Sequence, residues 1–140
     1  MAILVAASAT ELVAAEAAIG PLPGFRHLRR PETGLVMLRG RIGGEGTKFS
    51  LGEATVTRCL VITDAGTEGA AFHIGRDLAK AEKAALFEAL AREPRWREKI
   101  EAALLAPVKA RIANERRTKA AAAAATRVEF FTMVRGEDQR

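Results

Sequence analysis

Residues Arg41–Arg58 read Arg-Ile-Gly-Gly-Glu-Gly-Thr-Lys-Phe-Ser-Leu-Gly-Glu-Ala-Thr-Val-Thr-Arg. This stretch decides the fold because it is too polar and too rich in glycine to form a core. A sharp reversal is expected near its start, where residues that accept positive φ are needed: Gly43, Gly44 and Gly46. Apolar and polar residues then alternate from Lys48 to Leu51, which is typical of a half-buried strand, and a second strand is predicted from Glu53.

The predicted hairpin gathers many polar side chains at one end. Val56 is expected to share a face with Ala54 and Arg58, while the side chains on either side of Val56 point the other way. The polar set is Arg41, Lys48, Glu53, Thr55, Thr57 and Arg58. Neither phosphate-loop motif fits, because the glycine spacing is wrong and both motifs need a helix where a strand is predicted. A tight hairpin with solvated charges is the plain alternative.

Composition favours one domain, residues 1–140, with a modest core. Hydrophobic residues make up 49% of the 140 residues but aromatic residues only 5%, which suits closely packed helices or surfaces that bury against another protein. The single cysteine, Cys59, rules out an internal disulfide framework and fits a reducing compartment. The apolar start, Met1–Ala7, is too short to span a bilayer. We therefore expect a cytoplasmic protein with no membrane partner.

The chain is basic, with a net charge of +5 and a pI near 10.0. Much of the excess lies between Arg92 and Lys119, on predicted helices that also carry apolar stripes. Interleaved aromatic residues and nucleic-acid-binding motifs are missing there, so a nucleic-acid partner is not expected. A solvated helix face, or a surface that meets an acidic partner or a polyphosphate, explains the charge better.

The order of predicted elements gives an α+β fold. A capping box at Ser8–Glu11 begins an N-terminal helix, and an antiparallel β-meander of about five strands follows it. Two of those strands are predicted at Phe25–Arg30 and Leu35–Arg41, with a turn between them. Asp77 is a good N-cap for a first C-terminal helix, and further helices are predicted to start at Pro94 and Pro107. A strand-like tail, residues 126–140, ends the chain and is predicted to dock on the sheet or on a neighbour.

Five blocks of the chain are distinctive: Glu32-Thr33-Gly34-Leu35-Val36, Gly43-Gly44-Glu45-Gly46-Thr47-Lys48-Phe49, Gly52-Glu53-Ala54-Thr55-Val56-Thr57-Arg58, Gly75-Arg76-Asp77 and Arg127-Val128-Glu129-Phe130-Phe131-Thr132-Met133-Val134-Arg135-Gly136. These blocks resemble the PhnG family, a subunit of the bacterial carbon–phosphorus lyase core complex in phosphonate metabolism. The match as a whole runs in order from about Ser8 to Asp138.

The resemblance implies an accessory subunit that acts with partner subunits. Together they transfer the ribose 5-triphosphate moiety of ATP to a phosphonate and release adenine, an alpha-D-ribose 1-methylphosphonate 5-triphosphate synthase activity. No cofactor is expected on this chain alone. The complex would use ATP with magnesium, and another subunit would use an iron–sulfur cluster with S-adenosylmethionine. The nucleosidase-type core subunit is the expected partner, and the isolated chain is expected to self-associate through its sheet edge or tail.

No catalytic or metal-ligating residue is predicted in this chain. His27 and His73 are expected at the surface or at an interface, and Cys59 is expected to be a buried, inert thiol. Guanidinium groups grip phosphate oxygens in a forked geometry, which makes three arginines candidates for anion contacts: Arg41, Arg58 and Arg76. Salt bridges to Glu53, Asp77 or partner carboxylates are the equal alternative for them.

Two further sets of candidates complete the predicted site. The polar hairpin set, which would shape or stabilise the partner's site, is Glu53, Thr55, Thr57 and Asp77. The docking set in the tail is Phe130, Phe131, Met133, Val134 and Arg135. A free-standing homo-oligomeric module that binds nucleotides or nucleic acid through the basic helices is the alternative function, and it predicts salt-sensitive binding without partners.

Overall fold

The computed structural model describes residues 2–41 and 46–126 of the chain. The predicted docking tail therefore lies outside the described residues, except for its first residue. The elements, in order, are α1 (Ala2–Ala6), α2 (Ala9–Ile19), β1 (Phe25–Gly40), β2 (Phe49–Thr63), β3 (Glu68–Ile74), α3 (Leu78–Arg92), α4 (Pro94–Ile100), a π-helical turn (Glu101–Leu105) and α5 (Ala106–Ala125). The chain divides into two compact units, with the boundary between Ala110 and Arg111.

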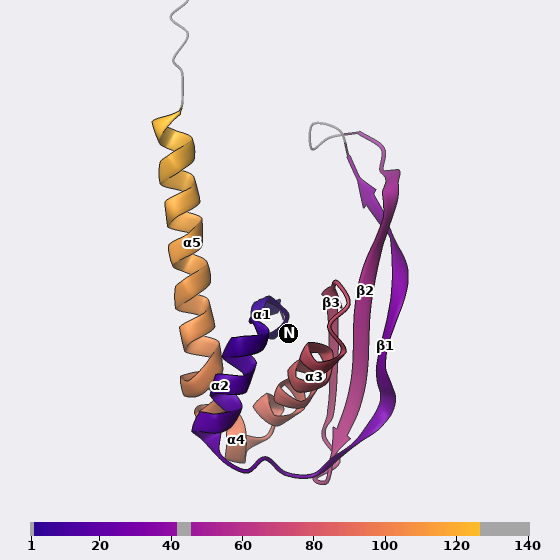
Figure 1. Cartoon of the computed structure of the whole chain (residues 1–140), viewed down its shortest axis with the longest axis vertical. Helices are drawn as coiled ribbons and strands as arrows, with labels where there is room; N and C mark the ends of the chain where they lie inside the picture. The colour runs from indigo at the N-terminus through magenta and orange to yellow at the C-terminus, as the bar shows by residue number, and fades with distance from the viewer. Residues whose placement is uncertain (1, 42–45, 127–140) are drawn as a thin grey trace, which may run out of the picture. The chain divides into compact units, whose positions relative to one another are not determined.

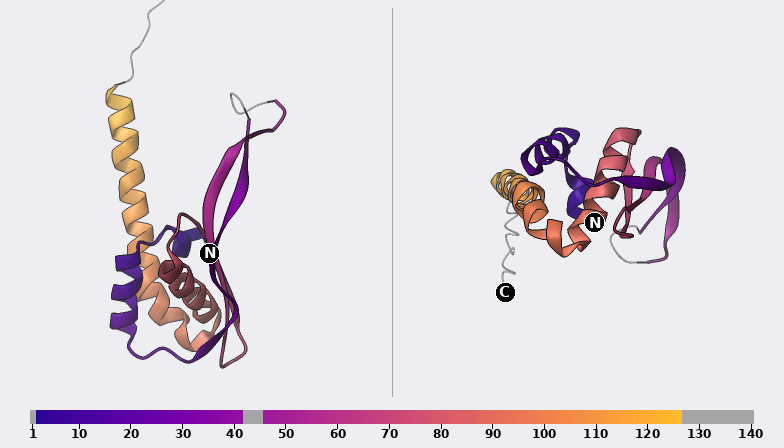
Figure 2. Two further views of the ribbon diagram at one scale, coloured as in Figure 1. Left: turned by 45° about the vertical axis from the view of Figure 1, so that its right-hand side comes forward. Right: turned by 90° about the horizontal axis from the view of Figure 1, so that it is seen from below.

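The first unit consists of one antiparallel sheet, in the order β1-β2-β3, and helices on one of its faces. Helix α3 contacts all three strands, and α1, α2 and α4 contact α3, with α1 also reaching β3. Figure 2 shows this layering from below, with the sheet on one side and these helices on the other. The α+β class is confirmed.

The prediction of about five strands is wrong, because the described residues form three. Pro31–Gly34, predicted as a turn, lies inside β1. The pairing of β1 with β2 shifts register between Arg29 and Glu32, and such an irregularity on an edge strand accepts a proline that cannot donate to the ladder. A second shift falls between Leu38 and Arg39, opposite Leu51. The strands predicted on either side of that bulge are therefore one strand, β2.

The core lies between α3 and the covered face of the sheet. Phe87 and Leu90 from α3 and Val61 from β2 are fully buried. Gly69 on β3 permits this contact, since a Cβ built at Gly69 would lie 2.1 Å from the carbonyl oxygen of Ala85. Small residues at the crossing thus let the helix backbone approach the strand directly.

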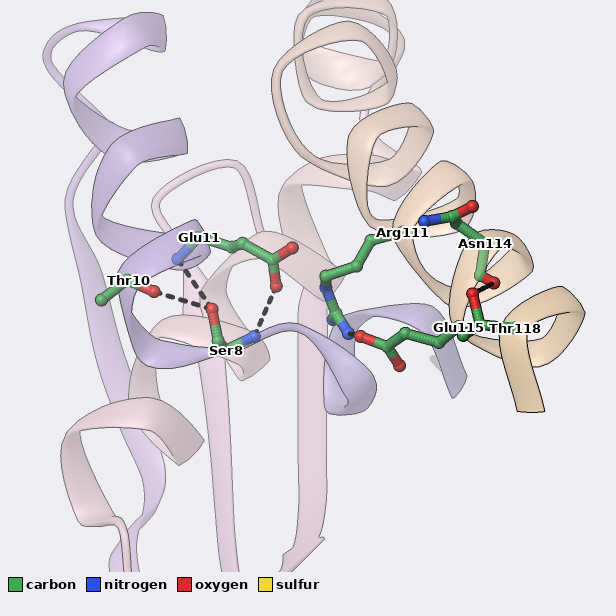
Figure 3. A network of polar contacts seen from close by, with 7 residues as sticks. All are labelled: Ser8, Thr10, Glu11, Arg111, Asn114, Glu115 and Thr118. Carbon is green, nitrogen blue, oxygen red and sulfur yellow. Dashed lines mark hydrogen bonds and ion pairs between the residues drawn. The ribbon is translucent and has the colours of Figure 1, made fainter. Parts of the chain in front are cut away.

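Helix starts follow the predicted caps. The Glu11 amide donates to Ser8 Oγ at 3.1 Å and the Ser8 amide donates to Glu11 Oε2 at 2.7 Å, which confirms the capping box (Figure 3). The Lys80 amide donates to Asp77 Oδ1 at 2.9 Å, which confirms Asp77 as the N-cap of α3.

The last helices depart from prediction at Pro107. A new helix was predicted to start there, but α5 begins at Ala106 and continues directly from the π-helical turn Glu101–Leu105. A proline inside a helix lacks the amide for the ladder and crowds the preceding turn, and a π-helical turn is an irregularity that relieves this.

The second unit contributes the rest of α5, up to Ala125. Figure 3 shows two of its internal contacts, an ion pair from Arg111 to Glu115 at 2.8 Å and a hydrogen bond that Thr118 Oγ1 donates to the Asn114 carbonyl at 3.1 Å. Such contacts one turn apart support an exposed helix. Within the described ranges, no helix combines the length and the apolar content needed to cross a bilayer.

Candidate functional site

Among the described residues of the first unit, one face of the sheet carries no helix (Figure 2). Odd-numbered residues of β2, such as Thr57, Cys59 and Val61, are buried under α3, while the even-numbered ones alternate onto the opposite face. We call this opposite face the open face. The register shift at Leu51 reverses this alternation at the start of β2, so that Phe49 and Leu51 share the face of Leu38 and Gly40. The exposed apolar side chains of the open face are Val36, Leu38, Phe49, Leu51, Phe72 and Ile74.

The open face continues onto a two-stranded extension, which we call the arm: Thr33–Gly40 of β1 paired with Phe49–Val56 of β2. The third strand stops where Ile74 pairs with Val56, so the part of the chain that the structure describes places no third strand beside the arm. Figure 1 shows β1 and β2 continuing past the ends of β3 and α3.

The arm carries exposed apolar side chains on both faces. Leu35 and Met37, on the face opposite to Val36 and Leu38, are 63% and 54% exposed. A two-stranded ribbon with no core of its own is marginal in water. Exposed apolar residues contiguous over two strands mark a surface that binds another macromolecule.

The structure separates the predicted polar hairpin set. Thr55 and Glu53 lie opposite Leu35 and Met37, on the face from which Arg58 points away. Thr57 is fully buried, and its hydroxyl donates to the Gly75 carbonyl at 2.6 Å. The alternation predicted from the sequence, with Val56 and Arg58 on one face and the threonines on the other, is confirmed.

The three candidate arginines do not converge. Arg41 follows Gly40, which pairs with Phe49 at the far end of the arm. Arg58 lies nine positions after Phe49 along β2, which at about 3.3 Å per residue is roughly 30 Å. That span is too long for the guanidinium groups of Arg41 and Arg58 to contact one triphosphate. Arg76 is exposed in the short loop between β3 and α3.

Arg58 takes part in an ion-pair cluster on the open face. Its Nε lies 2.6 Å from Glu32 Oε1, and Arg29 Nη1 lies 2.7 Å from the same oxygen. Hydrogen bonds from Arg29 and then from Arg58 hold the pKa of the Glu32 carboxyl below its usual value. Arg58 thus has a salt bridge, as the alternative interpretation expected, but with Glu32 as its partner. Two arginines share one carboxylate, so the cluster carries a net positive charge.

The histidines occupy different environments. His27 Nε2 lies 2.8 Å from Glu82 Oε2 at the edge of the core. His73 is on the covered face and only 6% exposed, and neither ring nitrogen has a hydrogen-bond partner among the described residues. Burial, and then the Lys80 ammonium, lower the pKa of His73, while Asp77 raises it. The prediction of a surface position is wrong for His73, because α3 covers the strand.

Two other buried groups lie near the contact of α3 with the sheet. Cys59 is buried, as predicted, and burial raises the pKa of its thiol to about 11, which disfavours the reactive thiolate. Glu88 on α3 is buried, and one of its oxygens accepts a hydrogen bond from the Ala70 amide at 3.3 Å while the other lies 2.5 Å from Arg92 Nη2.

Sequence reasoning missed the apolar arm. The signal was present in the run Leu35-Val36-Met37-Leu38, which is apolar without alternation, as in strands that are covered on both faces. The Arg29–Glu32–Arg58 cluster had no local signal, because it depends on the register between β1 and β2. The docking set, Phe130 to Arg135, lies outside the described residues.

An α+β protein with one covered and one bare sheet face, and with an apolar arm, belongs to the class of subunits that work within a larger assembly. The comparisons with known proteins agree. The chain belongs to the PhnG family of phosphonate metabolism proteins, whose profile matches residues 1–136. It is also 49% identical, over 138 residues, to a protein of Rhizobium meliloti (strain 1021) named alpha-D-ribose 1-methylphosphonate 5-triphosphate synthase subunit PhnG. The matched region covers 99% of this chain and 88% of that protein.

Proposed function

We propose that this chain is an accessory subunit that binds the other subunits of its synthase through the open face and the arm, and that it supplies no catalytic group alone. The chain is a subunit of alpha-D-ribose 1-methylphosphonate 5-triphosphate synthase in phosphonate metabolism. The assembly would transfer the ribose 5-triphosphate moiety of ATP to a phosphonate and release adenine. ATP with magnesium, and the iron–sulfur chemistry with S-adenosylmethionine, would be handled by other subunits.

The bare apolar surface carries this proposal. Ile74 is 75% exposed and Leu51 is 61% exposed, and both lie on the open face with the other apolar residues that define it. Burying a side chain of this size is worth about 1.5–3 kcal/mol, so a partner that covers several of them gains much of the free energy an interface requires.

Of the candidate arginines, Arg58 fits a role within this surface. The cationic cluster of Arg29, Glu32 and Arg58 lies on the open face, where Arg58 pairs with Phe72 of β3, and it would meet a carboxylate or a phosphate of the neighbouring subunit. Glu53, Thr55, Thr57 and Asp77 would support the local structure: Thr57 and Asp77 already hold the β3–α3 connection.

Co-purification tests the proposal. The tagged chain is co-expressed with the other synthase subunits, and Ile74→Asp is compared with Val13→Asp. Both residues are exposed and apolar, but Val13 lies on α2 and not on the sheet. A charge on the open face should reduce the recovered subunits by about tenfold or more, while the α2 variant recovers them as the wild type does. Full recovery by Ile74→Asp would contradict docking through the open face.

A truncation tests the predicted tail separately. A chain ending at Ala125 should lose partner capture if residues from Phe130 to Val134 dock on a neighbour. If the full-length chain and the truncated chain both purify alone, the accessory role fails. Salt-sensitive binding of nucleotides or nucleic acid by the isolated chain would then favour the alternative function.

A further inference from the structure

The outer edge of the arm offers backbone hydrogen-bonding groups to a partner. Antiparallel residues alternate between pairs that exchange hydrogen bonds and pairs that do not. The Gly75 amide donates to the Thr55 carbonyl at 2.9 Å, and the Thr63 amide donates to the Thr67 carbonyl at 3.0 Å. Odd-numbered residues of β2 therefore direct their backbone groups to β3 and not to β1.

The consequence for β1 follows from its register. Thr33, Leu35 and Met37 lie opposite Thr57, Thr55 and Glu53, which are odd-numbered residues of β2. Their amides and carbonyls consequently point away from β2, toward the free edge of the sheet. The same rule directs the Ala70 amide to the outer edge of β3, which is where Glu88 accepts from it.

The two edges of the sheet differ in how well they resist pairing with an added strand, and so do the first and second halves of β1, before and after Thr33. Edge strands normally resist added strands through short length, prolines and charges. The β3 edge has 7 residues and the Glu88 carboxylate. The first half of β1, from Phe25 to Glu32, has Pro31 and a series of charged residues: Arg26, Arg29, Arg30 and Glu32. Between Thr33 and Leu38 the edge has none of these devices.

We infer that the β1 edge over Thr33–Leu38 pairs with an extended segment of another subunit, whose centre is apolar and whose ends are acidic. The inference rests on the proposed function for the source of the strand. Backbone pairing would supply affinity, and side chains on both faces of the arm would supply specificity. The acidic ends follow from charge: Arg26, Arg29 and Arg30 precede this window and Arg39 and Arg41 follow it, against the single carboxylate of Glu32.

A second copy of this chain is a poorer occupant. Strand β1 with Arg41 carries five arginines and one glutamate. Two such edges in register would bring an excess of like charge together, and like charges on facing strands are destabilising. An acidic segment from another chain turns the same charges into attraction.

A peptide experiment tests the edge without any other subunit. The full chain is mixed with a synthetic peptide of about nine residues that alternates valine and threonine between glutamate ends, and amide hydrogen exchange is followed by NMR. The acidic peptide should slow exchange at Leu35 and Met37 by about tenfold or more, while the same peptide with lysine ends should not. Equal protection by both peptides, or by neither, would overturn the inference. Concentration-dependent protection in the chain alone would do so too, by identifying a second copy as the occupant.

Two variants of Leu35 test the same edge in the assembled synthase. Leu35→Pro removes an outward amide that makes no bond to β2, and Leu35→Ala removes the side chain but keeps the amide. With the co-expressed synthase subunits, Leu35→Pro should reduce recovery by about tenfold, roughly 1.4 kcal/mol, and the alanine variant by much less. Equal recovery with both variants overturns the inference. Protection by the peptide together with failure of the wild-type chain to recover any subunit would count against the proposed function instead.

Discussion

The two stretches of strand β2 differ in what covers them. From Thr57 to Thr63, β2 lies under α3 and its inward side chains are buried, whereas from Phe49 to Val56 the strand belongs to the arm and its large apolar residues Phe49 and Leu51 are exposed. Both stretches have strand propensity, so local sequence does not separate them. What separates them is the helix. Residues in the covered half stabilise the fold, and residues in the arm are available for binding.

The largest expected difference between the two regions concerns leucines. Leu90→Ala, at a fully buried position on α3, should lower the free energy of unfolding by about 2–5 kcal/mol, since it removes buried methyl groups and leaves a cavity. Leu35→Ala on the arm should change the same free energy by less than about 0.5 kcal/mol. Urea unfolding of the isolated chain measures both. A large loss with Leu35→Ala would mean that the arm is part of the core.

Glycines give the second comparison. Gly69→Ala should cost about 1–3 kcal/mol or more, because its Cβ would lie 2.1 Å from the Ala85 carbonyl oxygen and the helix would have to move. Gly34→Ala on the arm has no atom within 4 Å of the added Cβ and should be neutral or slightly stabilising. Thermal unfolding of the two variants compares them directly. Equal melting temperatures would contradict the close approach of α3 to β3.

The pH dependence of the free energy of unfolding tests the burial of His73 on the covered face. The pKa of His73 is lowered in the folded chain, chiefly by burial, so protons bind the unfolded chain more readily. This residue should therefore leave stability intact above about pH 6.5 and reduce it as the pH falls below that value. Unfolding free energies at pH 7.5 and pH 5.5 should differ less in His73→Gln than in the wild type. An identical pH dependence would show that the His73 side chain does not titrate as a buried group.

The substitution of Arg58 is expected to have the smallest effect on stability. Arg58→Ala should hardly change the free energy of unfolding, because exposed ion pairs contribute little. It should nevertheless lower assembly or synthase activity, measured as growth on a phosphonate as the only phosphorus source. Arg58→Lys keeps the charge but loses the forked geometry, and serves as the conservative comparison. Unchanged growth of the alanine variant would contradict a role at the interface.

Local signals predicted the features that local physics decides. Ser8 and Glu11 form their capping box within one turn, Asp77 caps the helix that follows it, and Val56 alternates with the neighbouring threonines along one strand. Each of these depends on residues within a few positions of each other. The family resemblance likewise rested on contiguous blocks of residues.

Features that depend on distant packing were missed. Pro31 was expected to end a strand, but an edge strand with a register shift accommodates it. The partner of Arg58 is Glu32, 26 residues earlier, which only the pairing of β1 with β2 brings near. His73 was expected at the surface, and its burial depends on where α3 packs. For the open face, the sequence shows apolar alternation but not which side the helices cover.

Glu88 has a consequence for stoichiometry. Open-ended fibres grow when every copy presents two complementary edges, one to receive a neighbour and one to offer itself. By occupying an outward amide in the short strand β3, the Glu88 carboxylate makes that edge a poor acceptor. A sheet that accepts strands at β1 alone can be extended once and then stops. If partner strands add to the β1 edge as inferred above, the Glu88 carboxylate would prevent further extension at β3 and keep the assembly finite.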